Sequence, residues 1–161
     1  MRAARFILTS KKNMSGTNQI EILLVEDDPD DLDMTLRALS KANLANHIQV
    51  ARDGVEAVDY IFGQGNYAGR NAEQTPRLVM LDLKFPKMDG LEVLRRIKSD
   101  PRTKLTPVVI MTSSKEQKDV LESYHLGVNS YIVKPVNFEG FATAVQSLGF
   151  YWLLLNQSPA H

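Results

Sequence analysis

The chain has 161 residues, which is enough for one domain and short for two. Its 19 basic and 19 acidic residues balance, so no overall field would draw the protein onto nucleic acid or an anionic membrane surface. Cysteine is absent, which excludes disulfides and thiolate metal sites and fits a reducing, cytoplasmic compartment, and no apolar run approaches the roughly 20 residues of a membrane-spanning helix.

The first nineteen residues differ in composition from the rest of the chain. Four basic residues occur there, and the first acidic residue is Glu21. We expect residues 1–19 to be a disordered leader, with Met14 as an alternative start. A transit peptide is the other interpretation, because such peptides are basic and poor in acid.

From residue 20 onward, two apolar patterns alternate along the chain. Short apolar runs with β-branched residues predict strands at residues 21–25, 47–51, 77–82, 107–112 and 130–134. After each run, apolar residues recur at helical spacing, as Leu32, Leu36 and Leu39 do after the first. The long segment 63–76 is polar and rich in glycine, which indicates a loop.

Polar residues at the predicted helix starts support these boundaries. Asp28 and Asp89 are placed to cap two of the helices, and Pro29 suits a first helical turn. Ser114 followed by Gln117 predicts a capping box at the start of the fourth helix. Five strand–helix units in succession predict an α/β domain with a parallel sheet that is covered by helices on both faces.

Polar residues gather where the predicted strands end. The carboxyl ends of parallel strands meet at one edge of a sheet, which is where ligands bind in open α/β folds. The residues predicted at this edge are Glu26, Asp27 and Asp28 after the first strand, Asp82 after the third, Thr112 and Ser113 after the fourth, and Lys134 and Pro135 after the fifth.

Each side-chain type at this edge has a chemical use. Crowded carboxylates repel one another, and a hard divalent cation such as Mg²⁺ relieves the repulsion. An ammonium such as that of Lys134 needs a partner, which is Asp82 or an arriving anion, and Thr112 can donate a hydrogen bond to that anion. A cation, an ammonium and a hydroxyl around one carboxylate form a receptacle for a phosphoryl group, with the carboxylate as nucleophile.

Four separate motifs resemble the receiver domain of two-component response regulators. They are "LLVEDDPDD", "VMLDLKFPKMDG", "VVIMTSS" and "NSYIVKPV", and the resemblance covers about residues 20–148. It implies a flavodoxin-like, doubly wound (βα)5 fold. It also implies that Asp82 accepts a phosphoryl group from a phosphohistidine of a sensor histidine kinase, so that the protein signals rather than acting as an enzyme on a separate substrate.

The same resemblance assigns roles to the residues around Asp82. It implies that Glu26, Asp27, Asp82 and the backbone carbonyl of Lys84 hold Mg²⁺. The residues that it places around the phosphoryl group are Lys134 and Thr112, which contact its oxygens, Tyr131, which turns inward when Thr112 moves toward them, and Pro135, which follows a cis peptide bond.

The acidic residues Asp30, Asp31 and Asp33 are expected to be helix N-terminal charges that the helix dipole favours. A phosphatase of the haloacid dehalogenase type is an alternative, but that family has a second Asp where this chain has Lys84. A receiver-like binding module that is not phosphorylated is a further alternative.

The end of the chain suggests how the signal leaves the domain. The chain ends at His161, so we expect no DNA-binding output domain and a signal that passes through protein contacts or a phosphorelay. The loop at residues 63–76 and the ending "FYWLLLNQSP" resemble the phytochrome-associated single-domain regulators, which implies a phytochrome as the sensor kinase.

The last predicted helix is apolar on more faces than one sheet can cover. Its spacing predicts that one line of residues covers the sheet, namely Phe138, Phe141, Val145, Leu148, Trp152 and Leu155. We therefore expect residues 149–161 to extend this helix into a homodimer contact beside the strand that carries Tyr131, formed by Phe150, Tyr151, Trp152, Leu154 and Leu155. A C-terminal tail folded over the core is the alternative.

Overall fold

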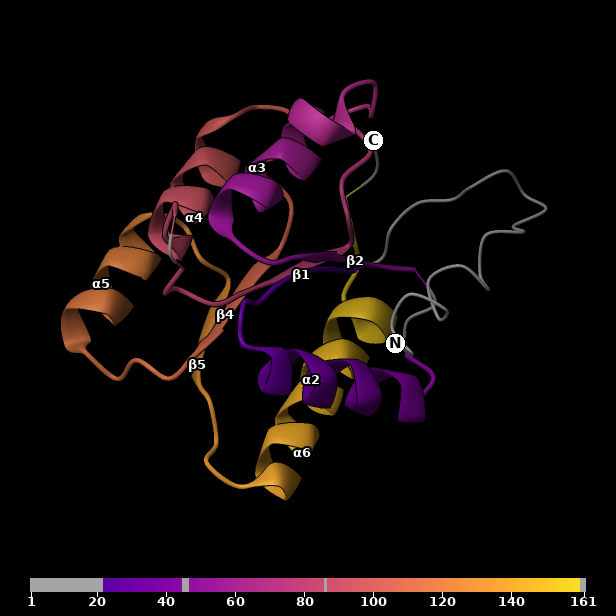
Figure 1. The fold of residues 1–161 in the computed structure, drawn as a ribbon, viewed down its shortest axis with the longest axis vertical. Helices are drawn as coiled ribbons and strands as arrows, with labels where there is room; N and C mark the ends of the chain where they lie inside the picture. The colour runs from indigo at the N-terminus through magenta and orange to yellow at the C-terminus, as the bar shows by residue number, and fades with distance from the viewer. Residues whose placement is uncertain (1–21, 45–46, 86, 160–161) are drawn as a thin grey trace.

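A computed structural model of the chain describes residues 22–44, 47–85 and 87–159 (Figure 1). The predicted leader at residues 1–19 lies outside the described residues, as does the final His161. No helix within these described ranges is long and apolar enough to cross a membrane.

The described residues form one five-stranded sheet whose paired strands all run parallel. Its spatial order is β2-β1-β3-β4-β5, as a doubly wound fold requires. This confirms the predicted fold class. The strands are β1 (Ile22–Val25), β2 (Ile48–Ala51), β3 (Leu78–Leu81), β4 (Val108–Thr112) and β5 (Ser130–Val133).

Helices cover both faces of the sheet, with α2 and α6 on one face and α3, α4 and α5 on the other (Figure 1). The helices are α2 (Pro29–Lys41), α3 (Gly54–Phe62), α4 (Gly90–Ser99), α5 (Gln117–His125) and α6 (Phe138–Gly149), followed by the π-helix η2 (Phe150–Leu155), and a short 3-10 helix, η1 (Gly65–Tyr67), follows α3.

The sheet separates two apolar cores, because successive strand residues point to opposite faces. In β1, Ile22 and Leu24 join the core under α2 and α6, whereas Leu23 and Val25 join the core under α3 and α4. All four side chains are almost fully buried, and each contributes about 1.5–3 kcal/mol relative to an exposed side chain. The continuous apolar runs in the sequence therefore correspond to strands buried on both faces.

The predicted caps of α2 and α4 are present. Asp28 accepts a hydrogen bond from the Asp30 backbone N–H at 2.9 Å, with Pro29 at the start of α2. Asp89 accepts from the Glu92 backbone N–H at 3.1 Å.

The capping box predicted at Ser114 was wrong, since α5 begins at Gln117 and its N-cap residue Glu116 makes no side-chain capping bond. The Ser114 hydroxyl instead donates to Asp119, a contact that competes with the predicted cap.

The last helix departs from the expected regular spacing. Phe141, Val145 and Leu148 are buried as predicted, but the next buried apolar side chain is that of Leu153. The reason is that Phe150–Leu155 forms a π-helix, whose i→i+5 bonding gives a wider turn and shifts the following side chains. Leu155, predicted to face the sheet, is therefore exposed, and Phe138, at the first position of α6, is exposed as well.

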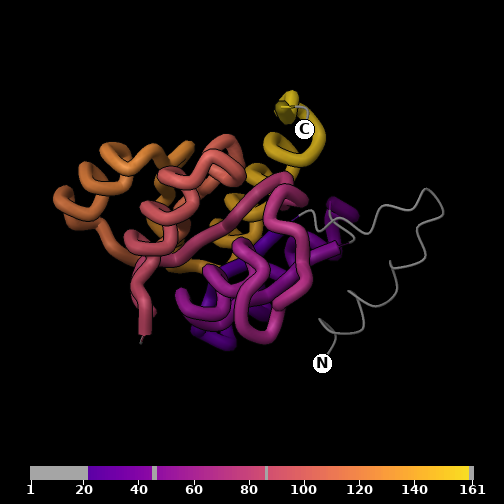
Figure 2. Tube along the Cα trace, turned by 90° about the horizontal axis from the view of Figure 1, so that it is seen from above, coloured from indigo at the N-terminus to yellow at the C-terminus, as the bar shows by residue number. Residues whose placement is uncertain are grey.

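The C-terminal segment lies far from the carboxyl ends of the strands. Helix α6 starts after β5 at that edge and runs back across the sheet, so η2 lies at the opposite end (Figures 1 and 2). Leu153 belongs to the core under α2 and α6, whereas Tyr131 packs against the other core. The Tyr131 side chain and Leu153 therefore lie on opposite faces of the sheet, although Ile132 of the same strand packs against the core that contains Leu153. The dimer contact beside this strand stays a prediction.

Candidate functional site

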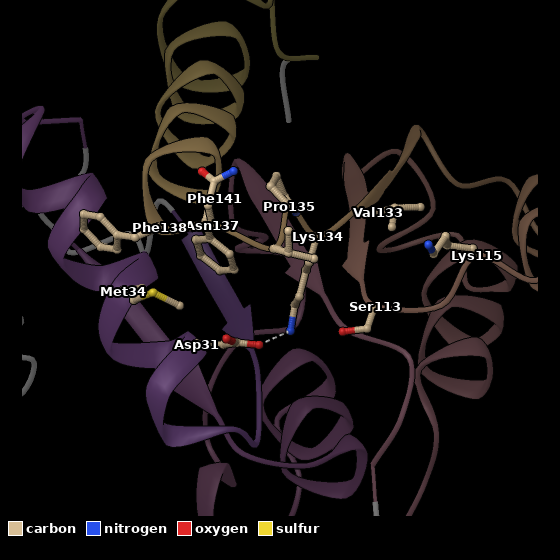
Figure 3. A pocket seen from close by; sticks show the side chains of 11 residues that line it. Asp31, Met34, Ser113, Lys115, Val133, Lys134, Pro135, Asn137, Phe138 and Phe141 are labelled. Carbon is tan, nitrogen blue, oxygen red and sulfur yellow. Dashed lines mark hydrogen bonds and ion pairs between the residues drawn. The ribbon is translucent and has the colours of Figure 1, made fainter.

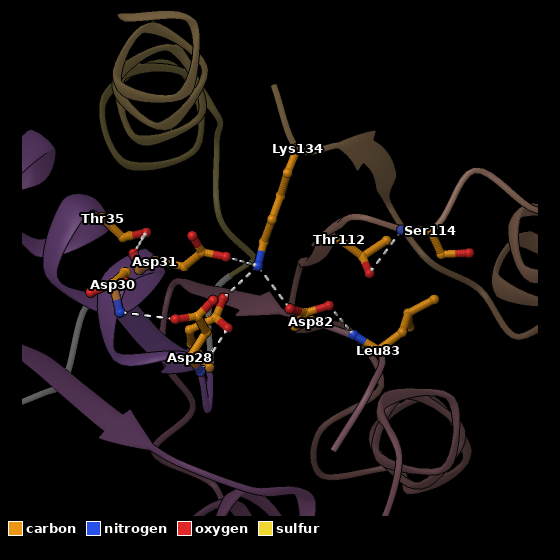
Figure 4. A network of polar contacts seen from close by, with 10 residues as sticks. Asp28, Asp30, Asp31, Thr35, Asp82, Leu83, Thr112, Ser114 and Lys134 are labelled. Atoms are coloured by element: carbon orange, nitrogen blue, oxygen red, sulfur yellow. Dashed lines mark hydrogen bonds and ion pairs between the residues drawn. The ribbon is translucent and has the colours of Figure 1, made fainter. Parts of the chain in front are cut away.

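The site lies where the strand order changes direction, between β1 and β3. Glu26 directly follows β1 and Asp82 directly follows β3, so both carboxylates lie at this switch point. Lys134 follows β5 and reaches across β4 toward them (Figure 4). Chain topology thus brings together residues that are separated by more than fifty positions in the sequence.

Three carboxylates surround the Lys134 ammonium. Its Nζ atom lies 2.9 Å from Glu26 Oε1, 2.6 Å from Asp31 Oδ2 and 2.8 Å from Asp82 Oδ2. The Lys134 side chain is 8% exposed, so these carboxylates take the place of water as its hydrogen-bond partners. The predicted pairing of Lys134 with Asp82 is present.

The contact between Asp31 and Lys134 was not predicted from the sequence, because Asp31 was expected to be only a helix N-terminal charge that the helix dipole favours. Asp31 is in the first turn of α2 and leads the helical face that continues with Thr35 and Leu39, both of which are buried. Its side chain therefore points inward, toward the strand ends. The spacing of four residues from Asp31 to Thr35 and Leu39 was the signal in the sequence that could have revealed it.

Three carboxylates against one ammonium leave two negative charges uncompensated when all four groups are ionised. Burial raises the pKa of Glu26 to about 7, although Lys134 acts to lower it. Burial alone would lower the pKa of Lys134, but its hydrogen bonds to Asp31 and Asp82 and the nearby negative charges hold this pKa above its usual value. Lys134 therefore stays protonated at neutral pH, while Glu26 is near its midpoint.

The Asp82 carboxylate is held at both oxygens. Oδ1 accepts from the Leu83 backbone N–H at 2.6 Å, and Oδ2 accepts from Lys134. The start of α4 packs directly on this backbone, because a Cβ at Gly90 would lie 2.2 Å from the Asp82 carbonyl oxygen. Only glycine fits at position 90, and the Met-Asp-Gly turn therefore supports the position of Asp82.

Thr112 and Tyr131 lie on the β4 and β5 side of the site. Thr112 is buried, and its Oγ1 atom accepts from the Ser114 backbone N–H at 3.4 Å. Tyr131 is half-buried, and its hydroxyl donates to the Ser114 carbonyl oxygen at 3.0 Å. The expected switch, in which Tyr131 turns inward when Thr112 moves toward the phosphoryl oxygens, stays a prediction.

The predicted cis bond before Pro135 was wrong, because the described residues contain no cis peptide. The trans form is the intrinsically favoured one even before proline.

The predicted metal ligands are only partly assembled. Asp27 is exposed beside Glu26, and Lys84 is exposed two residues after Asp82. Among the described residues, no three acidic or histidine side chains form a ready metal site, and Lys134 lies between the carboxylates instead. The surplus of carboxylate oxygens and negative charge nevertheless fits a hard divalent cation with oxygen ligands.

A pocket of about 330 Å³ opens beside Lys134, between α2 and the loop that follows β5 (Figure 3). Asp31 and Lys134 form its polar floor, and Met34, Phe138 and Phe141 contribute apolar walls. This pocket gives the Lys134 side of the site an opening to solvent.

Comparison with known proteins agrees with this geometry. Residues 22–146 match the model of the response regulator receiver domain. The chain is 40% identical over 139 residues to a probable methanogenesis regulatory protein, FilR2 of Methanothrix harundinacea, and the match covers 86% of each chain.

Two solved structures are also similar to this chain. One is the phosphorylated cyanobacterial phytochrome response regulator RcpA, at 38% identity and a TM-score of 0.80, covering 86% of this chain and 97% of that one. The other is the bacteriophytochrome response regulator AtBRR, at 51% identity and a TM-score of 0.65, covering 84% of this chain and 96% of that one.

Proposed function

The chain belongs to the family of response regulator receiver domains, and from that membership we propose that Asp82 is the residue that accepts the phosphoryl group. Asp82 follows the central strand β3, and its Oδ2 atom lies 2.8 Å from Lys134 Nζ. This contact is the observation that carries the proposal. Glu26 is less available as a nucleophile, because burial raises its pKa to about 7 and leaves much of it protonated at neutral pH. The family membership excludes the haloacid dehalogenase alternative.

The reaction is a phosphoryl transfer from a phosphohistidine of a sensor kinase. A carboxylate oxygen of Asp82 forms a bond to phosphorus while the phosphorus–nitrogen bond breaks and the imidazole leaves. Lys134 is already within hydrogen-bond distance of Asp82 and can shift its contacts to the phosphoryl oxygens. The Thr112 hydroxyl, at the end of the neighbouring strand β4, donates a further hydrogen bond there.

Receiver domains bind a divalent cation at the phosphorylation site, and the residues here that would hold it are Glu26, Asp27, Asp82 and the backbone carbonyl of Lys84. Mg²⁺ suits a site with few carboxylates and room for water ligands. When bound, the cation neutralises charge on the phosphoryl oxygens.

The proposal is tested by incubating the wild-type protein with phosphoramidate, a small phosphohistidine analogue, with and without Mg²⁺. Intact-protein mass measurement should show addition of one phosphoryl group in the presence of Mg²⁺. An unchanged mass under both conditions would support the alternative of a receiver-like binding module that is not phosphorylated.

Asp27→Ala should weaken Mg²⁺ binding by at least about tenfold, because it removes an exposed carboxylate that no protein group replaces. Titration calorimetry of the unphosphorylated protein measures this affinity directly. Asp33→Ala is the matched control, since Asp33 pairs with Arg37 on the surface of α2. Equal Mg²⁺ affinity in wild type and Asp27→Ala would remove Asp27 from the ligand set.

The similarity to RcpA and AtBRR supports a phytochrome as the sensor kinase. The output that we propose is through protein contacts or a phosphorelay. Phosphotransfer rates test the choice of kinase. An autophosphorylated phytochrome kinase should transfer its phosphoryl group to Asp82 faster than histidine kinases without a phytochrome module. Equal rates from both kinds of kinase would contradict the phytochrome assignment.

The C-terminal segment supports a homodimer that forms without phosphorylation. Phe150, Tyr151, Leu154 and Leu155 of η2 are each about half exposed or more, whereas Trp152 packs partly against the core. Covering these apolar side chains with a second copy would stabilise the pair by about 1.5–3 kcal/mol for each one fully buried. Sedimentation of the unphosphorylated protein at low micromolar concentration should therefore show a dimer.

Leu154→Glu should shift that dimer to monomer, because it places a charge in the apolar contact. Leu121→Glu is the matched control, since Leu121 on α5 is 60% exposed, as Leu154 is, but lies on the other face of the fold. A wild-type monomer, or a dimer that both variants leave intact, would exclude this interface.

A further inference from the structure

A second buried acid, Asp119, lies outside the Lys134 network. Asp119 is on α5, and its side chain is 7% exposed. Its Oδ2 atom accepts a hydrogen bond from the Ser114 hydroxyl at 2.5 Å and lies 3.6 Å from Lys84 Nζ. One carboxylate therefore holds two side chains that come from different loops.

Both side chains come from loops that leave the phosphoacceptor site. Lys84 is two residues after Asp82 on the loop that follows β3, and Ser114 is two residues after Thr112 on the loop that follows β4. The Ser114 backbone also bonds to Thr112 Oγ1 and to the Tyr131 hydroxyl. Asp119 thus attaches these two loops to α5.

We propose that Asp119 is a positioning residue that holds the Lys84 ammonium away from the phosphoryl group on Asp82 and thereby sets how long that group survives. The inference rests on the proposed function of Asp82. Nothing else among the described residues forms an ion pair with Lys84. The position of its ammonium therefore depends on a competition between Asp119 and the phosphoryl oxygens.

Loss of the Asp119 charge shifts this competition toward the phosphoryl oxygens. The Lys84 side chain is 69% exposed, so its ion pair with Asp119 is weak and easily exchanged. A phosphoryl group carries more negative charge than a single carboxylate and presents three acceptor oxygens. Once released from Asp119, Lys84 therefore moves onto the phosphoryl group.

That movement would slow hydrolysis of the phosphorylated aspartate. In hydrolysis, a water oxygen bonds to phosphorus while the bond from phosphorus to the Asp82 oxygen breaks, which releases inorganic phosphate and restores the carboxylate. A lysine side chain lying over the phosphoryl group obstructs the approach of that water. By holding Lys84 back, Asp119 keeps the approach open and the phosphoryl lifetime short.

The test is a double-mutant cycle on phosphoryl lifetime. Wild type, Asp119→Asn, Lys84→Met and the double variant are phosphorylated with phosphoramidate and Mg²⁺, the donor is removed, and loss of the phosphoryl group is followed by intact-protein mass. Asp119→Asn keeps an oxygen that accepts from Ser114 but loses the charge that attracts Lys84. Asp100→Asn, which removes the same charge from a pair with Arg102 on the loop after α4, is the matched control.

Asp119→Asn should lengthen the lifetime about two- to fivefold, the factor that corresponds to the free energy of an exposed ion pair. In the Lys84→Met background the same substitution should have no effect, whereas a merely structural effect of Asp119→Asn would persist there. An unchanged or shortened lifetime in Asp119→Asn overturns the inference, as does an equal change in both backgrounds. If wild type itself accepts no phosphoryl group, the proposed function fails, and the inference fails with it.

Discussion

Asp82→Asn is expected to abolish formation of the acyl phosphate while leaving the fold intact. The substitution removes the nucleophilic carboxylate oxygen but keeps an amide of the same shape, whose oxygen can still accept from the Leu83 N–H or from Lys134. It also removes one of three carboxylates crowded around a single ammonium, so the variant should be at least as stable as wild type. Intact-protein mass after treatment with phosphoramidate and Mg²⁺, together with thermal unfolding, measures both effects.

Asp53→Asn is the matched control for this variant. Asp53 follows β2 at the same edge of the sheet but caps α3, where asparagine serves about equally well. The control should be phosphorylated as wild type is. Phosphorylation of Asp82→Asn to the wild-type level would show that another residue is the acceptor.

Lys134→Met is expected to lower the free energy of unfolding by about 3–5 kcal/mol near pH 8 and to reduce phosphorylation strongly. Methionine fills a similar volume but leaves Glu26, Asp31 and Asp82 without their shared ammonium. Removing one partner of a buried ion pair costs this much because the remaining charges stay buried and unpaired. Phosphorylation falls as well, since no ammonium contacts the phosphoryl oxygens.

The loss of stability should depend on pH through Glu26. Burial raises its pKa from 4.5 to about 7, so between these values the folded protein keeps a proton that the unfolded chain has released. The free energy of unfolding therefore falls as pH rises through this window. Because Lys134 acts to lower this pKa, its removal extends the window upward, and the difference between variant and wild type should be larger near pH 8 than near pH 5.5.

Lys98→Met is the control that distinguishes the pH-dependent loss of stability in Lys134→Met from the effect of removing any partly buried ammonium. Lys98 Nζ donates to the carbonyl oxygens of Lys104 and Thr106 and to the side chain of Asn129, which are all neutral acceptors. Lys98→Met retains Glu26 and Lys134, so the difference in stability between this variant and wild type should not change through Glu26. Burial lowers the pKa of Lys98 itself to about 8, so its own titration contributes little below pH 7.5. Denaturant unfolding of wild type and both variants between pH 5.5 and 7.5 measures these differences, and a difference from wild type that changes equally with pH in both variants would contradict the assigned role of Lys134.

Much of the fold could be predicted from the sequence because the interactions that define it are local. A buried strand such as Ile22–Val25 appears as a continuous apolar run, and caps such as Asp28 and Asp89 bond to backbone amides two or three residues away. Parallel order then required Asp82 and Lys134 to meet at one edge of the sheet. The sequence by itself therefore determined the fold class and the pair at the centre of the site.

The tertiary structure alone decided which further side chains join that pair. Asp31 reaches Lys134, and Asp119 holds both Ser114 and Lys84, because packed helices turn these residues toward neighbouring loops. Local spacing indicates that Asp31 faces inward but does not identify its partner, and it does not predict the Asp119 contacts, since each contact joins elements whose relative rotation is set by packing against the sheet. The same applies to the π-helix after Gly149, where Leu153 is buried in place of the residue that regular helical spacing predicts. Local periodicity locates an element, whereas the direction of each side chain depends on the elements against which it packs.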